Sequence, residues 1–229
     1  MTLHFSVYNY IENLKSVYAQ NANVELAFQM AKYMKNKFVF YGIKKPDRDI
    51  IIKAFHSLYG WPPPENVNAV AMLLWKDPER EMHYFAMMLL FRFKKHISPS
   101  IITLYEDIIT SNSWWDTVDH IAVKLVGNYF KVFPEQILTV THKWMNSGNM
   151  WLQRSCILFQ LTYKKDIDVD LLFSFIRPCA ASNEFFIQKA IGWTLREYAK
   201  TNPATVLAFV EQTPLKPLSK REALRIMMK

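Results

Sequence analysis

The amino-acid sequence predicts an all-α protein, a HEAT-like repeat solenoid of stacked antiparallel helix pairs with one concave face. Helical periodicity runs through the whole chain, and prolines stand where first helical turns tolerate them. Alternating apolar runs bounded by hairpin turns are lacking, which argues against a sheet. The strongest helices recur about every 35 residues, a period typical of repeat arrays. We therefore expect one repeat domain over residues 1–229.

The expected helices fall into long and short members of each pair. The long ones are predicted to begin near Glu79, Trp114, Met150 and Phe185. The others are expected at 22–36, 46–59, 99–111, 134–147 and 168–179, with less regular phasing in the amino-terminal part. Ser113 and Asp116 have the spacing of a capping box at one start. Residues 59–65, which include three consecutive prolines, are expected to form a rigid loop.

Composition narrows the class of function. Hydrophobic residues make up 51% of the chain, so it can bury a sizeable core. The formal net charge of +8 favours a polyanionic partner, because neutralised phosphates release condensed counterions. Five glycines form neither a GxGxxG motif nor a P-loop. These features favour nucleic acid as a partner and argue against a nucleotide cradled by a glycine-rich turn.

Several other classes are disfavoured by the sequence. Cys156 and Cys179 lack CxxC spacing, and the six histidines are scattered, so we expect neither a disulfide framework nor a metal site. There is no nucleophile elbow, and no cofactor is expected. A basic region followed by an apolar stretch is lacking at the amino terminus, and apolar runs are too short to span a bilayer. The expected location is the bacterial cytoplasm, at the nucleoid, and nothing requires a dimer, so a monomer is expected.

Four residues from three helical segments are predicted to converge. At about 100° per residue, Trp115, Asp119, Arg154 and Trp193 fall within an arc of about 100° on their helices. Equivalent faces of successive helices line one wall of a solenoid. Two indoles, a carboxylate and a guanidinium in one place suit a positively charged ring carried by a polyanion. Asp119 stands between apolar residues, where a carboxylate needs a partner or a function.

The last long helix carries a basic stripe. Lys189, Trp193, Arg196 and Lys200 share one face, and apolar residues such as Ile191 occupy the other. Cations interleaved with an exposed tryptophan are typical of a groove for phosphates and a base or sugar.

Each of these residues also has a structural interpretation. Trp115 and Trp193 could simply be core residues, and Arg154 could pair with a nearby carboxylate. We assign Asp116 to the helix amino terminus. Glu79, Glu81 and His83 are expected to form a solvated helix face. Residues 44–48 form either a solvated turn or a basic loop that holds a phosphate at a helix start.

The sequence resembles the AlkD family of DNA alkylation repair proteins, which are HEAT-like repeat DNA glycosylases. The matching stretches lie throughout the chain: Ala31–Phe38 with Gly42, Ile43 and Pro46, then Trp114–Asp119, Trp151–Arg154, Phe185–Tyr198 and Leu218–Glu222. Their combination is specific, although no single stretch would be.

The resemblance implies excision of N3- and N7-alkylated purines, such as 3-methyladenine and 7-methylguanine, from double-stranded DNA. It implies that Trp115, Asp119 and Trp193 line the deoxyribose of the lesion, with the aspartate catalytic, and that Arg154 is an active-site arginine. Tyr33 matches a tyrosine on DNA-facing amino-terminal helices. The family is known to leave the damaged base stacked in the duplex, unlike most glycosylases. The candidate DNA-binding residues are Tyr33, Lys37, Lys44, Arg48, Lys189, Arg196 and Lys200.

Two other functions remain open at this stage. The chain could be a non-catalytic HEAT-repeat protein that binds distorted or branched DNA. It could also be a protein-binding scaffold with an acidic partner, a common role of helical solenoids.

Overall fold

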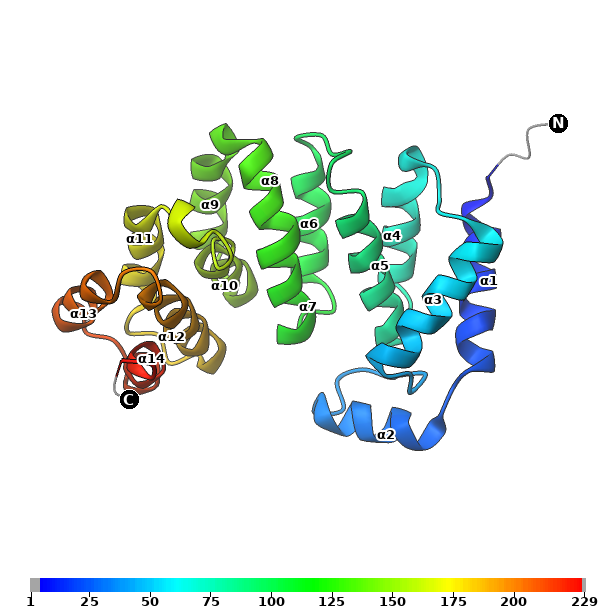
Figure 1. The fold of residues 1–229 in the computed structure, drawn as a ribbon, viewed down its shortest axis with the longest axis horizontal. Helices are drawn as coiled ribbons and strands as arrows, with labels where there is room; N and C mark the ends of the chain where they lie inside the picture. Colours follow the sequence, from blue (N-terminus) through cyan, green and yellow to red (C-terminus); the bar gives the residue numbers. More distant parts are fainter. Residues whose placement is uncertain (1–4, 228–229) are drawn as a thin grey trace. The chain divides into compact units, whose positions relative to one another are not determined.

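The structure is a computed structural model that describes residues 5–227, and throughout this part of the chain it is helical (Figure 1). The predicted all-α class is therefore confirmed. The described residues contain no strand, and an isolated bridge joins Val39 to Glu79. The chain divides into two compact units, one ending at Ile97 and the other beginning at Ser98. The expectation of a single repeat domain stays a prediction.

The first unit is built from α-helices joined by short turns. They are α1 (Val7–Gln20), α2 (Val24–Tyr33), α3 (Lys45–Tyr59), α4 (Val67–Trp75) and α5 (Arg80–Arg92), with a 3₁₀ turn η1 (Pro64–Asn66) before α4. Helix α4 packs extensively on α5, and α1 contacts both α3 and α4. Helix α2 runs crosswise to α1 and α3 and has no buried residue (Figure 1).

The second unit continues the alternation of helices. Its elements are α6 (Ile101–Thr110), α7 (Trp115–His120), η2 (Ile121–Val126), α8 (Gly127–Val132), η3 (Pro134–Gln136), α9 (Ile137–Met145), α10 (Met150–Leu158), η4 (Lys164–Asp166), α11 (Val169–Cys179), α12 (Phe185–Ala199), α13 (Pro203–Gln212) and α14 (Pro217–Leu224). Segment η2 is a π-helix, so residues 115–132 form one helical run with a wider turn in its middle.

The repeat period predicted from the sequence is present in the helix starts. Helices α5, α7, α10 and α12 begin at Arg80, Trp115, Met150 and Phe185, each 35 residues after the previous one. The shorter helices α6, α9 and α11 lie within the expected ranges. A helix pair every 35 residues is the arrangement expected of a repeat array, in which each helix pair buries its apolar face against the neighbouring pairs.

The solvated face predicted for Glu79, Glu81 and His83 is wrong for two of the three residues. Glu81 and His83 are fully buried. The Glu81 carboxylate accepts hydrogen bonds from the backbone N–H groups of residues 41–43, at 3.0–3.1 Å. Helical periodicity could not reveal this contact, because the loop before α3 supplies the donors from about 40 residues away. Three N–H donors compensate for the burial of a charge.

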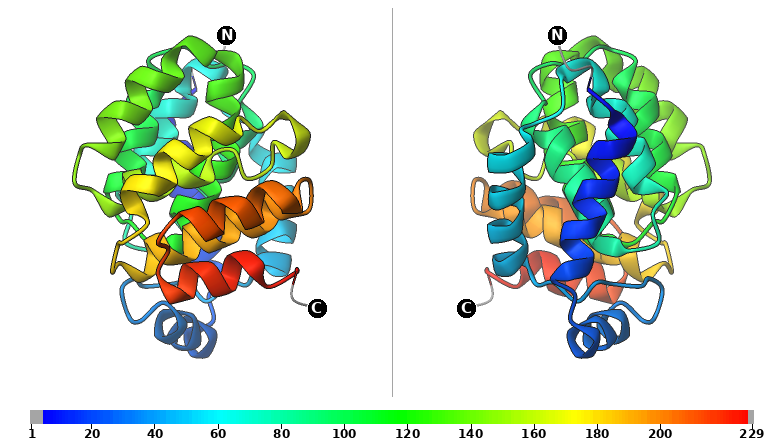
Figure 2. Two further views of the ribbon diagram at one scale, coloured as in Figure 1. Left: turned by 90° about the vertical axis from the view of Figure 1, so that its left-hand side faces the viewer. Right: turned by 90° about the vertical axis from the view of Figure 1, so that its right-hand side faces the viewer.

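Close packing of α12 on α14 depends on Gly192. A Cβ atom at this position would lie 2.4 Å from the Cβ of Glu222 and 3.0 Å from the carbonyl oxygen of Ser219. The Ser219 hydroxyl donates to the carbonyl of Gln188 at 3.1 Å, which fixes the two helices in register. Figure 2 shows α14, in red, running beside α12 and α13.

The predicted capping box at Ser113 is also wrong. Trp114 is the N-cap of α7, and the Ser113 hydroxyl donates to the carbonyl of Ile109 at the end of α6. Asp116 does lie in the first turn of α7, where a negative charge is favoured by the helix dipole.

Within the described residues, no helix combines the length and the apolar character that crossing a bilayer demands.

Candidate functional site

A pocket of about 340 Å³ in the second unit brings the four predicted site residues together. Helix α7 contributes Trp115 and Asp119, α10 contributes Arg154, and α12 contributes Trp193. The remaining lining residues also come from α12: Phe185, Phe186, Lys189 and Arg196. The convergence predicted from helical phasing is thus present in the structure.

Asp119 and Arg154 form a two-pronged ion pair at this pocket. The Arg154 Nε donates to Oδ1 of Asp119 at 2.7 Å, and Nη2 donates to Oδ2 at 2.8 Å. The third arm, Nη1, donates to the carbonyl oxygen of Phe186. The Arg154 side chain is 4% exposed and that of Asp119 is 16% exposed. Arg154 therefore lies behind the carboxylate and holds both oxygens in one orientation.

Burial and pairing act in opposite directions on the acidity of Asp119. Burial raises the pKa of the Asp119 carboxyl above its usual range, and the nearby charge of Asp116 raises this pKa further. The hydrogen bonds and the positive charge of Arg154 lower it. Arg154 therefore favours the ionised carboxylate in a place where burial alone would favour the neutral acid.

Trp115 and Trp193 are not core residues. Both indoles are partly exposed and line the pocket. The aromatic cluster behind them is made by neighbours: Phe186 packs on Trp114 and Trp151 with ring centroids 5.0 Å from each. This cluster supports the backbone carbonyl that binds Arg154.

Phe185 and Phe186 line the pocket but were not among the site residues predicted from the sequence. Phe185 begins α12 at the pocket and is 57% exposed, whereas Phe186 contributes both a ring and a carbonyl oxygen. The available signal was a pair of adjacent aromatic residues in the first turn of a predicted helix. Neighbouring positions on a helix point in different directions, so one of the two rings had to be exposed and the other packed. The sequence could not tell which was which, because that depends on the face of α12 that α10 covers.

Two cations of the predicted stripe are held by a carboxylate of α14. Lys189 lies 3.0 Å from Oε1 of Glu222, and Arg196 lies 2.5 Å from Oε2. The hydrogen bond and charge of Lys189, followed by those of Arg196, lower the pKa of Glu222, although burial opposes them. Lys189 and Arg196 thus line the pocket as parts of an ion-pair network.

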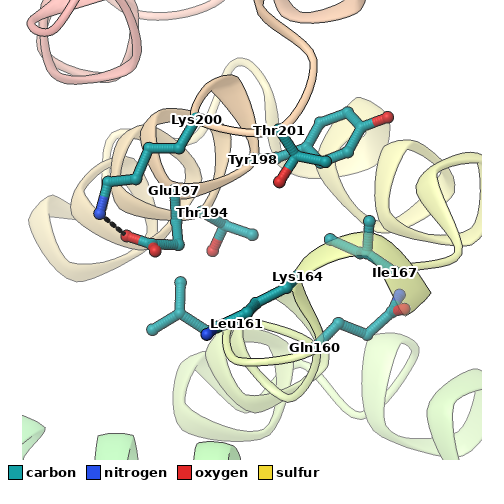
Figure 3. Close-up of a pocket in the computed structure, with 9 residues that line it drawn as sticks. All are labelled: Gln160, Leu161, Lys164, Ile167, Thr194, Glu197, Tyr198, Lys200 and Thr201. Atoms are coloured by element: carbon teal, nitrogen blue, oxygen red, sulfur yellow. Dashed lines mark hydrogen bonds and ion pairs between the residues drawn. The ribbon is translucent and has the colours of Figure 1, made fainter.

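Lys200, the fourth member of the predicted stripe, lines a different pocket of about 180 Å³. Figure 3 shows this second pocket, where Lys200 pairs with Glu197 at 2.6 Å. Leu161 and Tyr198 are among its other lining residues. Lys200 follows Lys189 by eleven residues, which is about three helical turns or roughly 16 Å along the axis, so the two side chains line different pockets although they point in similar directions.

The remaining predicted DNA-binding residues belong to the first unit. Tyr33 is 69% exposed at the end of α2, and Lys37 is exposed in the turn that follows. Lys44 is the exposed N-cap of α3. The Arg48 guanidinium lies over the Tyr84 ring, 4.6 Å from its centroid.

The pocket offers a defined set of chemical groups. It presents one carboxylate held by Arg154, two indole faces and two further cations, Lys189 and Arg196. The described residues contain no group of three or more potential metal ligands, so a metal site has no candidate there. A carboxylate beside aromatic faces can stabilise positive charge, and the cations can attract phosphates.

Comparisons with known proteins relate this arrangement to a family. The family model described as "DNA alkylation repair enzyme" matches residues 14–227. A solved structure described as a predicted DNA alkylation repair enzyme from Enterococcus faecalis is similar to this chain, with 32% sequence identity and a TM-score of 0.83. The match covers 91% of this chain and 97% of that one. No curated protein matches the chain. By its sequence and its fold, the chain belongs to the DNA alkylation repair enzyme family.

Proposed function

We propose that the protein is a DNA glycosylase that excises N3- and N7-alkylated purines, such as 3-methyladenine and 7-methylguanine, from double-stranded DNA. Family membership supports a role in the repair of alkylated DNA. One observation carries the finer proposal: the Asp119 carboxylate, held in one orientation by Arg154, lines the same pocket as two partly exposed indoles and two further cations. Alkylated purines carry a positive charge, and their sugar becomes positive as the base leaves.

The proposed reaction is hydrolysis of the N-glycosidic bond. As the bond from C1′ to the purine nitrogen breaks, its electron pair moves to the base, which leaves as a neutral alkylpurine. The sugar becomes an oxocarbenium ion. Water then adds to C1′ and loses a proton, which leaves an abasic site. Neither a metal nor an organic cofactor has a step in this sequence.

Asp119 has the largest proposed role. A preorganised charge near the developing oxocarbenium should lower the barrier by about 3 kcal/mol. The same carboxylate can accept a hydrogen bond from the attacking water and so orient it. Arg154 weakens the field of Asp119 in part, but it also keeps the carboxylate ionised and aimed at the pocket.

Trp115 and Trp193 are proposed to contact the sugar and the base. Aromatic faces attract positive charge, and this attraction is worth about 2 kcal/mol where water is excluded. Lys189 and Arg196 are proposed to bind the phosphates on either side of the lesion. Because an alkylated base is a good leaving group, these modest contributions suffice for repair.

The proposal is tested with methylated duplex DNA and identification of the freed bases. Replacing Asp119 with Asn should lower single-turnover release of 7-methylguanine by about 10²-fold, the scale for loss of one electrostatic stabiliser. Affinity for the DNA should stay close to that of the native protein, because the pocket cations remain.

Asp116 supplies a matched control. The Asp116→Asn change removes the same charge one turn earlier in α7, and its rate of release should remain near the native rate. Retention of methylated DNA without release of any base by the native protein would instead indicate a non-catalytic binding protein. Native-rate release by the Asp119→Asn variant would remove Asp119 from the mechanism.

A further inference from the structure

Glu222 on α14 contacts the pocket cations from outside the pocket. Its carboxylate binds Lys189 with one oxygen and Arg196 with the other, seven residues apart on α12. Trp193 lies between them, four residues after Lys189 and three before Arg196. These spacings place the three side chains on one helix face. Glu222 therefore brackets the indole that lines the pocket, although it does not itself line that pocket.

The position of Glu222 is fixed by the packing of α14 on α12. Its Cβ occupies the space left by the missing side chain of Gly192. The Arg196 guanidinium also donates to the backbone carbonyl of Glu222, at 3.4 Å. The carboxylate is only 13% exposed, and Arg225 approaches it to 3.8 Å. Because both the backbone carbonyl and the carboxylate oxygens of Glu222 are engaged, its side chain is a rigid support for the longer side chains of Lys189 and Arg196.

Charge is the second effect of this contact. Lys189 and Arg196 together carry two positive charges, and Glu222 neutralises one of them. The pocket rim therefore presents less charge to a polyanion than its two cations would alone. Undamaged DNA is attracted mainly by such charge, whereas excision depends on the placement of groups around the sugar.

We propose that Glu222 is a positioning residue: it holds Lys189 and Arg196 on either side of Trp193 and restrains the attraction of the pocket for undamaged DNA. The placement half of this inference rests on the proposed glycosylase function, and the binding half does not. Glu222 thus favours correct placement of a lesion over tight binding to any duplex.

The test is Glu222→Gln, which keeps the shape of the side chain and removes its charge. Binding is measured on an unmodified duplex across a series of salt concentrations. The affinity should rise roughly fivefold at 0.1 M salt, and the plot of log K against log salt should steepen by about 0.9, because one more phosphate is neutralised. Single-turnover release of 7-methylguanine at saturating DNA should fall about tenfold, because the two cations lose their fixed positions.

Glu106→Gln is a matched control in the same unit. Glu106 also accepts from two neighbouring side chains of another helix, Lys143 and Trp144, but it lines neither of the pockets described above. This change removes the same charge and a similar network. It should leave the salt slope and the release rate near native values, after correction for the folded fraction measured by thermal unfolding.

Opposite changes in binding and release distinguish positioning from structural support. A protein that is merely less stable would lose both properties together. An affinity for undamaged duplex that stays the same or falls in Glu222→Gln would overturn the inference. If the native protein released no base, the glycosylase proposal would fail, and the binding series would still decide the effect of Glu222 on the rim.

A second background sharpens the binding result. In a protein that already carries Lys189→Gln, Arg196→Gln and Arg225→Gln, adding Glu222→Gln should no longer steepen the salt dependence, because the cations that contact this carboxylate are gone. A persistent increase in slope there would show that Glu222 acts through general charge and would also overturn the inference.

Discussion

Two opposing effects set the acidity of Asp119, a largely buried carboxyl group. Its environment favours the neutral acid, and the forked contact with Arg154 opposes that preference. The pair is largely buried, so removal of one partner leaves an uncompensated charge, at a cost of about 3–5 kcal/mol. The cost is lower wherever Asp119 can take up a proton. Activity and stability at this position should therefore both depend on pH.

Replacing Arg154 with Gln should shift the acidic limb of the pH–rate profile to higher pH. Arg154 lowers the pKa of Asp119, so its loss raises that pKa further and the ionised form needs a higher pH. Arg154→Lys is the control that keeps the charge and loses the fork, and it should shift the limb less. The measurement is single-turnover base release between pH 5 and 8. Equal acidic limbs in all three proteins would contradict this role of Arg154.

The stability of the Arg154→Gln variant should follow the same titration. A carboxyl whose folded-state pKa is raised stabilises the fold below its unfolded pKa, and this stabilisation is lost as pH rises through the folded pKa. The deficit of the variant against the native protein should accordingly be largest near pH 8 and shrink toward pH 5. Denaturant unfolding at several pH values measures it.

The grouping of the four proposed site residues was predictable at the residue scale because each of them lies in a regular α-helical segment. Trp115 and Asp119 precede the π-helical segment that begins at Ile121, so helical-wheel arithmetic still applied to them. Arg154 and Trp193 lie on uninterrupted helices. The sequence offered two roles for Arg154, an active-site group and a partner of a nearby carboxylate, but it could not identify Asp119 as that carboxylate. Glu222 was also unpredictable as a partner, since no local pattern connects α14 to α12.

At the level of elements, α12 is the helix on which the site depends most. Its buried face follows the predicted apolar stripe, and residues of its opposite face line the pocket. Among the glycines of the second unit, Gly192 leaves the least room for a side chain, because α14 packs directly against it. The same contact supplies Glu222, so helix packing and the charge of the rim are linked.

Gly192→Ala tests this packing by the sign of its effect. In an isolated helix, Ala in place of Gly stabilises by about 0.5–1 kcal/mol. Here the added methyl group would lie 2.4 Å from the Cβ of Glu222, so the helices must separate. We expect destabilisation of about 1–3 kcal/mol, the usual cost of overpacking. Denaturant unfolding gives the answer, and a variant more stable than the native protein would show that α14 shifts freely.

Element boundaries were predicted best where proline and period agreed. Helix α13 begins at Pro203, in agreement with the prediction that prolines stand in first helical turns, and the Asn202 side chain caps it. Helix α5 begins at Arg80, one residue after the predicted start near Glu79. The burial of Glu81 was not predicted, because its hydrogen-bond donors lie in the loop at residues 41–43. Such long-range contacts leave no trace in local periodicity.

At the scale of the whole molecule, the net charge of +8 comes from cations for which different functions are proposed in the two units. All residues proposed for chemistry lie in the second unit. Tyr33, Lys37, Lys44 and Arg48 lie in the first unit, on or beside α2, which has no buried residue, and α3, which has two. If these residues bind DNA, they supply attraction that is the same for the substrate and the transition state. Such uniform binding affects KM and leaves kcat unchanged.

Replacing Lys44 and Arg48 together with Gln should therefore raise KM for methylated duplex and leave the rate at saturating DNA near native. Two lost phosphate contacts should reduce the salt slope by about 1.8, because each contact contributes about 0.9. Lys53→Gln with Lys45→Gln is the matched control, since both exposed lysines lie on α3 and the charge change is equal. Lys45 pairs with Asp49, so it should contribute less to DNA binding than a cation without such a neighbour.

Equal slopes for the two double variants would mean that α3 attracts DNA only through its overall charge. A fall in kcat for Lys44 and Arg48 would instead place them in contact with the lesion, because only interactions that strengthen in the transition state change that rate.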